Sequence, residues 1–176
     1  YPDDNVVQII FTDAAWSERY TPYRNSIWIH QDQMKWPGPT LMRYHMIASI
    51  TYLLADFDML FYCDVDMKFV GRVDKLCVPL YRGLIATVHP GYYNKPPHQW
   101  TVERRPQSTA YVPFGKEAAN YYAGGFQGGT THAFLSAADQ ISNAITADER
   151  KGITAIWHDE SHWQAYLAKN PRHVKL

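Results

Sequence analysis

Short apolar runs bounded by polar and turn residues recur along the chain, and each predicts a β-strand. They cover residues 6–11, 26–30, 59–63 and 84–88. The run at 59–63 carries no charged or turn residue, so we expect it to be a buried core strand. The chain stops at residues 174–176, which are typical of the beginning of one more strand.

Three other segments repeat apolar residues every three or four positions, which is typical of helices that bury one face. Helices are predicted from about Thr40 to Leu54, from about Thr131 onwards, and from near Asp159 to Asn170. The positions expected to face the core are Leu41, Tyr44, Ile47, Ile50, Phe134, Ala138, Ile141, Ile145, Trp163, Tyr166 and Leu167.

Strands alternate with helices, so we expect an α/β fold with its active-site loops at the carboxyl ends of the strands. The segment 92–113 is rich in Pro, Tyr, Arg and Gln and is expected to form a long ordered loop. No linker or repeat divides the 176 residues, which predicts a single domain over residues 1–176. Because the chain begins at Tyr1 without Met and stops at a strand start, we expect a trimmed domain.

Composition narrows the choice of partners. Lys plus Arg and Asp plus Glu both number 17, so the net charge is zero and nothing favours a nucleic acid. No apolar run reaches the length of a membrane span, and no membrane contact is evident from the sequence. Aromatic residues make up 15% of the chain, which fits sugar ligands and an aromatic core equally. Cys63 and Cys77 match neither a zinc-site spacing nor a disulfide framework.

An acidic pair, Asp64 and Asp66, directly follows the apolar run at 59–63. In an extended chain, residues two apart point to the same face, about 7 Å apart, so both carboxylates could meet one ligand. Carboxylate oxygens suit a hard divalent cation such as Mn²⁺ or Mg²⁺ that also binds phosphate oxygens. The pair therefore predicts a metal and phosphate site.

A second acidic cluster, WHDESH, begins at Trp157. His158 and His162 are one helical turn apart, as in the zinc motif His-Glu-x-x-His, which leaves a zinc-dependent hydrolase as an alternative. That motif requires Glu directly after the first His, whereas Asp159 stands there, and Glu160 would point away from the shared face. We expect Asp159 to cap the N-terminus of the helix.

Glycines at Gly124, Gly125, Gly128 and Gly129 match neither a Walker loop nor a dinucleotide fingerprint. These glycines could serve either to form a tight turn or to let the backbone approach a sugar closely. Arg43, on the first predicted helix, is either solvated or reaches Asp64 and the ligand. The charged loop at 103–107 is expected to be a structural salt-bridge cluster rather than a catalytic group.

Taken in order, YCDVDM, HPGYY, TVERRPQSTAYVP, YYAGGFQGG and IWHDESHWQAYL resemble glycosyltransferase family 6, from about residue 6 to residue 176. The resemblance implies a GT-A fold, a Rossmann-like mixed sheet flanked by helices. It also implies Mn²⁺ (or Mg²⁺), a UDP-sugar donor, and retaining α1,3 transfer of N-acetylgalactosamine or galactose. The implied acceptor is an oligosaccharide or glycolipid that contains galactose, fucosylated or plain. Relative to the family, the chain is expected to lack the first strand and the basic C-terminal tail.

The matching motifs imply roles for individual residues. Asp64 and Asp66 resemble the metal ligands, with Asp64 also on the donor side, and Glu160 resembles the carboxylate below the anomeric carbon. The donor-side matches are Arg43, Ala123, Gly124, Gly125, His158 and Asp159. The acceptor-side matches are His89, Thr101 and Trp157. The small Ala123 and Gly125 favour N-acetylgalactosamine as the donor sugar.

Several alternatives stay open on the sequence. Double displacement through Glu160 and a front-face mechanism both fit, and a non-catalytic sugar-binding module is a third class beside the transferase and the hydrolase. The resemblance implies a cytoplasmic location for a microbial chain and the Golgi lumen for a vertebrate one.

Overall fold

The computed structural model describes residues 6–15, 25–71, 83–171 and 174–175. The chain forms two compact units, Tyr1–Pro39 and Thr40–Leu176. In the first unit, strands β1 (Gln8–Thr12) and β2 (Ser26–His30) pair in parallel. The predicted strand at 26–30 is confirmed, and the one expected at 6–11 begins two residues later.

The second unit contains a mixed sheet with the strand order β3-β5-β4-β6. Its strands are β3 (Met59–Cys63), β4 (Leu84–Val88), β5 (Tyr122–Thr130) and β6 (Val174–Lys175). Strand β5 runs antiparallel to both β3 and β4, and β6 runs parallel to β4. The predicted strands at 59–63, 84–88 and the chain end are confirmed, as is the mixed α/β class expected of a GT-A fold.

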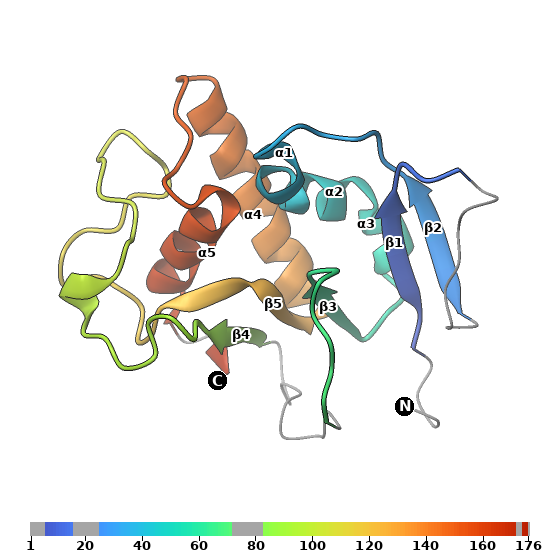
Figure 1. Cartoon of the computed structure of the whole chain (residues 1–176), viewed down its shortest axis with the longest axis horizontal. Coiled ribbons are helices and arrows are strands. Elements are labelled where there is room, and N and C mark those ends of the chain that lie inside the picture. The colour runs from blue at the N-terminus through green and yellow to red at the C-terminus, as the bar shows by residue number, and fades with distance from the viewer. Residues whose placement is uncertain (1–5, 16–24, 72–82, 172–173, 176) are drawn as a thin grey trace. The chain divides into compact units, whose positions relative to one another are not determined.

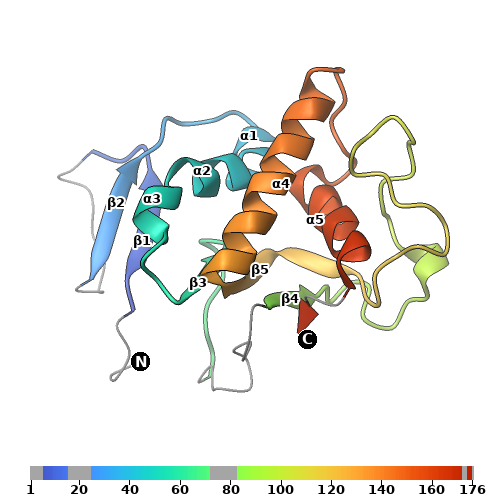
Figure 2. The same cartoon turned by 180° about the vertical axis from the view of Figure 1, so that it is seen from behind.

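Helices α2 (Arg43–Ser49), α4 (Thr131–Glu149) and α5 (His158–Lys169) lie on one face of this sheet (Figures 1 and 2). Both long helices begin where the apolar periodicity predicts them. Their inward residues are buried as expected: Phe134, Ala138, Ile141, Ile145, Trp163, Tyr166 and Leu167. None of the helices within the described ranges is long and apolar enough to cross a membrane.

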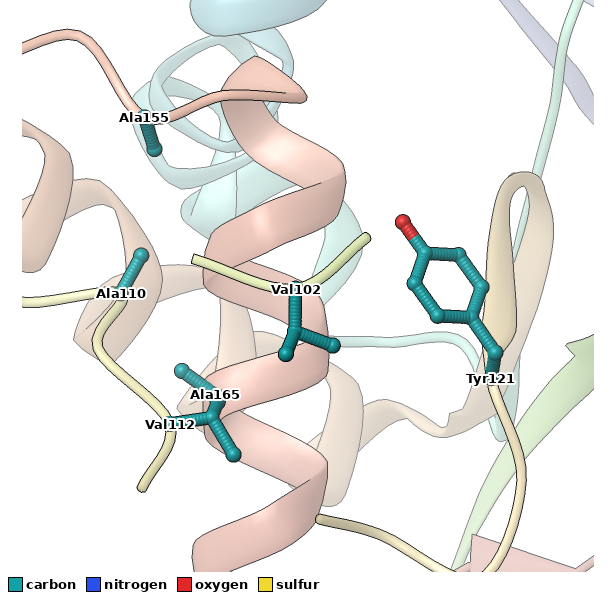
Figure 3. Packing of buried hydrophobic residues seen from close by; sticks show 6 residues of the cluster. All are labelled: Val102, Ala110, Val112, Tyr121, Ala155 and Ala165. Atoms are coloured by element: carbon teal, nitrogen blue, oxygen red, sulfur yellow. The ribbon is translucent and has the colours of Figure 1, made fainter. Parts of the chain in front are cut away.

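The segment 92–113 is a loop, as predicted, with only the short 3₁₀ turn η3 (Pro97–Gln99). Val102, Ala110 and Val112 from this loop pack on Ala165 of α5 in a small buried cluster (Figure 3). The buried carboxylate of Asp148 accepts hydrogen bonds from the loop and so ties it to α4.

The helix predicted from Thr40 to Leu54 is instead three short pieces, α1 (Gly38–Leu41), α2 and α3 (Thr51–Leu54). The break after α2 has a local cause. The Ser49 and Thr51 hydroxyls donate to main-chain carbonyls three residues back, both over 2.8 Å. Such bonds compete with the helical ladder and bend or interrupt it.

Strand β3 is only half-buried, and the expectation of a core strand is wrong. The ring of Phe61 is 42% exposed, although it stacks on Phe126 of β5 at 6.0 Å between centroids. Within the described sheet β3 is an end strand, so one of its edges lacks a neighbour there. An apolar run alone does not distinguish an end strand from a central one.

The surroundings of His162 predict how stability depends on pH. Burial lowers the pKa of His162 to about 4, with Asp148 at 3.8 Å opposing. Between about pH 6.5 and pH 4 the unfolded chain binds a proton that the folded chain excludes, so acid favours unfolding. The difference is worth about 3 kcal/mol. In urea unfolding, His162→Gln should therefore gain about that much relative to the wild type as the pH falls from 7 to 4.

His98, exposed in η3, gives the matched control. His98→Gln should follow the wild type at every pH. A stability difference between His162→Gln and the wild type that does not vary with pH would show that His162 does not titrate in this window.

Candidate active site

A cleft of about 370 Å³ opens on the second unit, where the end of β3, the middle of β5 and the start of α5 meet. Its walls are Thr40, Arg43, Asp64, His89, Tyr92, Gly124, Gly125, Trp157, His158, Asp159 and Glu160. Every site residue predicted from the sequence is among them except Asp66, Ala123 and Thr101. The fold therefore gathers into one cleft residues that lie far apart in the sequence.

Strand β5 bulges where it passes this cleft. On its β4 side, Gln127 lies opposite Ala86, but Ala123 already lies opposite Thr87. Residues 124–126 consequently have no partner on β4. A bulge bends its strand and re-aims backbone groups, often beside an active site. It explains why Ala123 stays in the ladder while the two residues after it line the cleft.

On its other side β5 pairs regularly with β3, and the pairing continues past the end of β3. The Asp64 N–H donates to the Gly125 carbonyl over 2.8 Å. This register places the Asp64 side chain against Gly125: a Cβ on the glycine would lie 2.8 Å from Asp64 Oδ2. The absence of a side chain at position 125 therefore makes room for the carboxylate.

Gly124 links Glu160 on one side of the site to Arg43 on the other through its main-chain groups. Its N–H donates to Glu160 Oε2 over 2.9 Å, and its carbonyl accepts from Arg43 Nη1 at 2.5 Å and from Gln127 Nε2 at 3.1 Å. Gln127 is fully buried, and its amide oxygen accepts from the Tyr44 hydroxyl at 2.7 Å. The bulge thus frees two polar groups that a regular ladder would use, and both find partners among the site residues and their supports.

Arg43 is 4% exposed and forms the centre of the charged network. Its Nη2 donates to Asp64 Oδ1 over 3.1 Å, and its Nη1 lies 3.0 Å from Asp159 Oδ2. Its guanidinium also stacks 4.2 Å from the centroid of the Tyr62 ring. Burial alone would lower the pKa of Arg43, but the surrounding carboxyl and phenol groups, with Asp159 the strongest among them, together outweigh burial and raise the pKa overall. The interpretation in which Arg43 reaches Asp64 is confirmed.

The expected capping of α5 by Asp159 is wrong. The helix begins one residue earlier, at His158, and the Trp157 N–H donates instead to Ser161 Oγ over 2.9 Å. The Asp159 side chain is buried against Arg43, because a buried guanidinium needs a nearby carboxylate. Burial raises the pKa of Asp159 to about 7, while Arg43 opposes the rise.

Glu160 presents a half-buried carboxylate to the cleft. Its Oε2 accepts from the Gly124 N–H and its Oε1 from the Tyr121 hydroxyl, each over 2.9 Å. With one donor on each oxygen, the carboxylate has a fixed orientation. Such a group can stabilise positive charge that develops at a reacting carbon.

The extended geometry expected for Asp64 and Asp66 is not observed, because β3 ends at Cys63. The Asp64 carbonyl accepts from the Met67 N–H over 3.1 Å, so residues 64–67 form a turn. Asp64 lines the cleft, whereas Asp66 is exposed and lies outside its walls.

The donor atoms of this turn nevertheless suit a hard cation. Asp64 Oδ1 is engaged by Arg43 and by the Tyr62 hydroxyl, and its Oδ2 lies beside Gly125. Asp66 adds a second exposed carboxylate two residues away. Among the described residues, no three His, Cys, Asp or Glu side chains are placed to hold a metal together. With only these two carboxylates, a cation of the Mg²⁺ type would have to take most of its ligands from water and phosphate.

The two histidines of the zinc alternative have different surroundings. His158 lines the cleft in a left-handed conformation, φ 49°, which histidine adopts more readily than most residues. His162 is buried, with its Nδ1 3.5 Å from Thr109 Oγ1 and its Nε2 3.8 Å from Asp148. This arrangement does not resemble a shared metal face.

One wall of the cleft is aromatic. His89 and Tyr92 line it, and Tyr121 packs behind them with its ring centroid 4.2 Å from that of Tyr92. Thr101 lies behind the wall: its Oγ1 accepts from the Tyr92 hydroxyl at 2.7 Å. Sequence reasoning missed Tyr92, Tyr121 and Thr40. The tyrosines stand in the motifs HPGYY and YYAGGFQGG, which could have drawn attention to them.

The predicted charged cluster at 103–107 is confirmed and braces the segment before α5. The buried Glu103 accepts from Arg105 Nη2 at 2.6 Å and from the Ile156 N–H at 2.9 Å. Arg105 also donates to the Thr154 carbonyl at 2.6 Å. The hydrogen bonds from Arg105 lower the pKa of Glu103 to about 2. The cluster thus fixes the chain directly before Trp157, which is 46% exposed at the cleft.

The sequence also resembles characterised proteins. It is 38% identical over 135 residues to rat histo-blood group ABO system transferase 1, covering 76% of this chain and 38% of that protein. It is 37% identical over 143 residues to human globoside alpha-1,3-N-acetylgalactosaminyltransferase 1, covering 80% and 40%. It is 31% identical over 164 residues to the O-antigen biosynthesis glycosyltransferase WbnI of Escherichia coli, covering 92% and 68%.

The chain therefore spans less than half the length of the rat and human relatives. The sequence model of glycosyltransferase family 6 matches residues 21–175, which include every residue of the cleft. The chain belongs to glycosyltransferase family 6.

Proposed function

We propose that this chain is the catalytic region of a metal-dependent retaining glycosyltransferase. It would move N-acetylgalactosamine, or galactose less well, from a UDP-sugar to the 3-OH of a galactose-containing acceptor. One observation carries the proposal: the Gly124 main chain links Arg43 to Glu160 in the cleft, and Arg43 also bonds Asp64 directly.

In this reaction the bond from the anomeric carbon to the diphosphate oxygen breaks. The acceptor 3-oxygen bonds to that carbon, and the acceptor proton leaves with the diphosphate. Glu160 would stabilise the positive charge that develops at the anomeric carbon, as the second carboxylate does in retaining glycosidases. Arg43, held between two carboxylates, would orient the donor sugar with its remaining donor capacity.

The charge of the cleft supports a role for a cation. Its walls carry the carboxylates of Asp64, Asp159 and Glu160 against one guanidinium, that of Arg43. A diphosphate would add further negative charge to these walls, which is unfavourable unless a cation accompanies it. A divalent cation held by Asp64 and Asp66 would supply Lewis-acid stabilisation of the leaving diphosphate.

The donor preference rests on the family resemblance, in which the small Ala123 and Gly125 stand at donor-selecting positions. The Asp64 carboxylate lies directly beside Gly125, so the space at position 125 is not open. One relative is named as an N-acetylgalactosaminyltransferase, which agrees with this choice. With both UDP-sugars competing in one tube, we expect more N-acetylgalactosamine than galactose in the product.

Replacement of Glu160 tests the catalytic role. Glu160→Ala should lower kcat by about a thousandfold, since it removes a main electrostatic stabiliser of the transition state. Binding of the UDP-sugar should change little, because this carboxylate faces the reacting carbon. Initial rates and calorimetric UDP-sugar titrations measure the two quantities.

Glu149→Ala, at an exposed site on α4, is the control and should keep wild-type rates. A loss of only a few fold in Glu160→Ala would assign that carboxylate a structural role. A β-linked product, seen by NMR, would contradict retention.

The metal is tested by binding of UDP rather than by turnover. Asp66→Ala should abolish the strengthening of UDP binding by Mn²⁺ and leave the unfolding curve unchanged, because Asp66 is exposed on a turn. Asp56→Ala, also exposed, should retain the Mn²⁺ effect. Equal UDP affinity for Asp66→Ala and wild type in Mn²⁺ would remove Asp66 from the metal site.

Gly125→Ala tests why position 125 lacks a side chain. The added methyl would fall 2.8 Å from Asp64 Oδ2 and force that carboxylate to move. We therefore expect use of both donor sugars to fall at least tenfold, with little change in their ratio, because a small displacement at the site is costly. A shift of the product ratio toward galactose would instead indicate that Gly125 sets the width of the sugar pocket.

A further inference from the structure

Tyr121 touches Glu160 without lining the cleft. It lies directly before β5, is 1% exposed, and belongs to the buried cluster that packs on α5. Its hydroxyl points toward the first turns of α5 (Figure 3) and donates to Glu160 Oε1 over 2.9 Å. The Thr101 carbonyl lies farther from the same hydroxyl, at 3.3 Å, and is the alternative acceptor for its one proton.

In this contact the Tyr121 phenol is the hydrogen-bond donor and the Glu160 carboxylate is the acceptor. Burial raises the pKa of the Tyr121 phenol, and the nearby Glu160 carboxylate raises it further. The phenol therefore stays protonated and acts as a donor, and the carboxylate is the acceptor. A buried donor that faces a carboxylate makes a stronger hydrogen bond than a neutral pair does.

The ring of Tyr121 is held from several sides. Its centroid lies 4.2 Å from that of Tyr92, 5.6 Å from that of His89 and 6.2 Å from that of Trp100. Tyr92 is tied in turn to Thr101 by a 2.7 Å hydrogen bond. The donor atom that meets Glu160 is therefore fixed by the same aromatic group that forms one wall of the cleft.

We propose that Tyr121 is a positioning residue that sets the orientation of the Glu160 carboxylate from the aromatic wall. This inference rests on the proposed function, in which Glu160 acts at the reacting carbon. Glu160 is held by a main-chain N–H on one oxygen and by Tyr121 on the other. Loss of the phenol would release one of these two restraints, and a small misplacement of a reacting group is enough to slow a reaction strongly.

The test is Tyr121→Phe, which keeps the ring and removes only the hydroxyl. We expect kcat to fall 10- to 100-fold, with KM for donor and acceptor and the affinity for UDP within twofold of wild type. Replacement by 4-aminophenylalanine restores a donor at the same place and should recover most of kcat.

Tyr122→Phe is the matched control: it removes the hydroxyl of the next, equally buried tyrosine, which is not in the cleft walls. It should keep the wild-type kcat. A kcat for Tyr121→Phe within twofold of wild type would overturn the inference. A raised KM with unchanged kcat would also overturn it, since that pattern describes a substrate contact.

A second measurement separates this inference from the proposed function. NMR titration of a ¹³C-labelled Glu160 carboxyl, assigned with Glu160→Gln, requires no turnover. A higher carboxyl pKa in Tyr121→Phe than in the wild type supports the inference even if no sugar transfer is found. Equal pKa values in the two proteins overturn it even if the wild type is an active transferase.

Discussion

The arrangement of the cleft depends on the main chain of one residue, Gly124. Its carbonyl accepts from Arg43 and its N–H donates to Glu160, so the cationic centre and the carboxylate are joined by a single peptide unit. Both groups are available because β5 bulges away from β4 at this point. A regular antiparallel strand would have used them in the ladder, where they could not contact side chains.

The burial of Arg43 explains much of the remaining geometry. A guanidinium taken out of water is costly unless carboxylates and other acceptors surround it. Asp64 arrives from the end of β3, Asp159 from the start of α5, and the Gly124 carbonyl from β5. One buried cation thereby fixes three elements that are far apart in the sequence. It also explains why Asp159, in the first turn of α5, faces inward.

Much of the sheet and both long helices could be predicted, because their signals are local. The apolar run at 59–63 and the periodicity after Thr131 both indicate an element without knowledge of its neighbours. The three-part helix before Leu54 was harder, since hydroxyl groups at Ser49 and Thr51 compete with the ladder. How far an element is buried also depends on its neighbours, which is why β3 was placed too deep in the core.

For the candidate site too, features with a local sequence signal could be predicted, and features that depend on distant partners could not. Motifs identified most of the cleft residues, because the residue types of Asp64, Glu160 and their neighbours are enough to mark them as candidates. The bulge could not be seen, because it exists only as a difference in register between two partner strands. The contact of Tyr121 with Glu160 was hidden as well, since the two residues are 39 positions apart in the sequence.

The bulge has a consequence for how this protein can change over time. Since Gly124 acts through its peptide groups, the number of residues between Ala123 and Gln127 matters as much as their identity. Removing one residue there would shift one side of β5 by a single position and reverse which side chains face the helices. Substitutions around the cleft leave this spacing intact, but an insertion or deletion in this short span would separate Arg43 from Glu160. The length of this span is therefore more constrained than the identity of its residues.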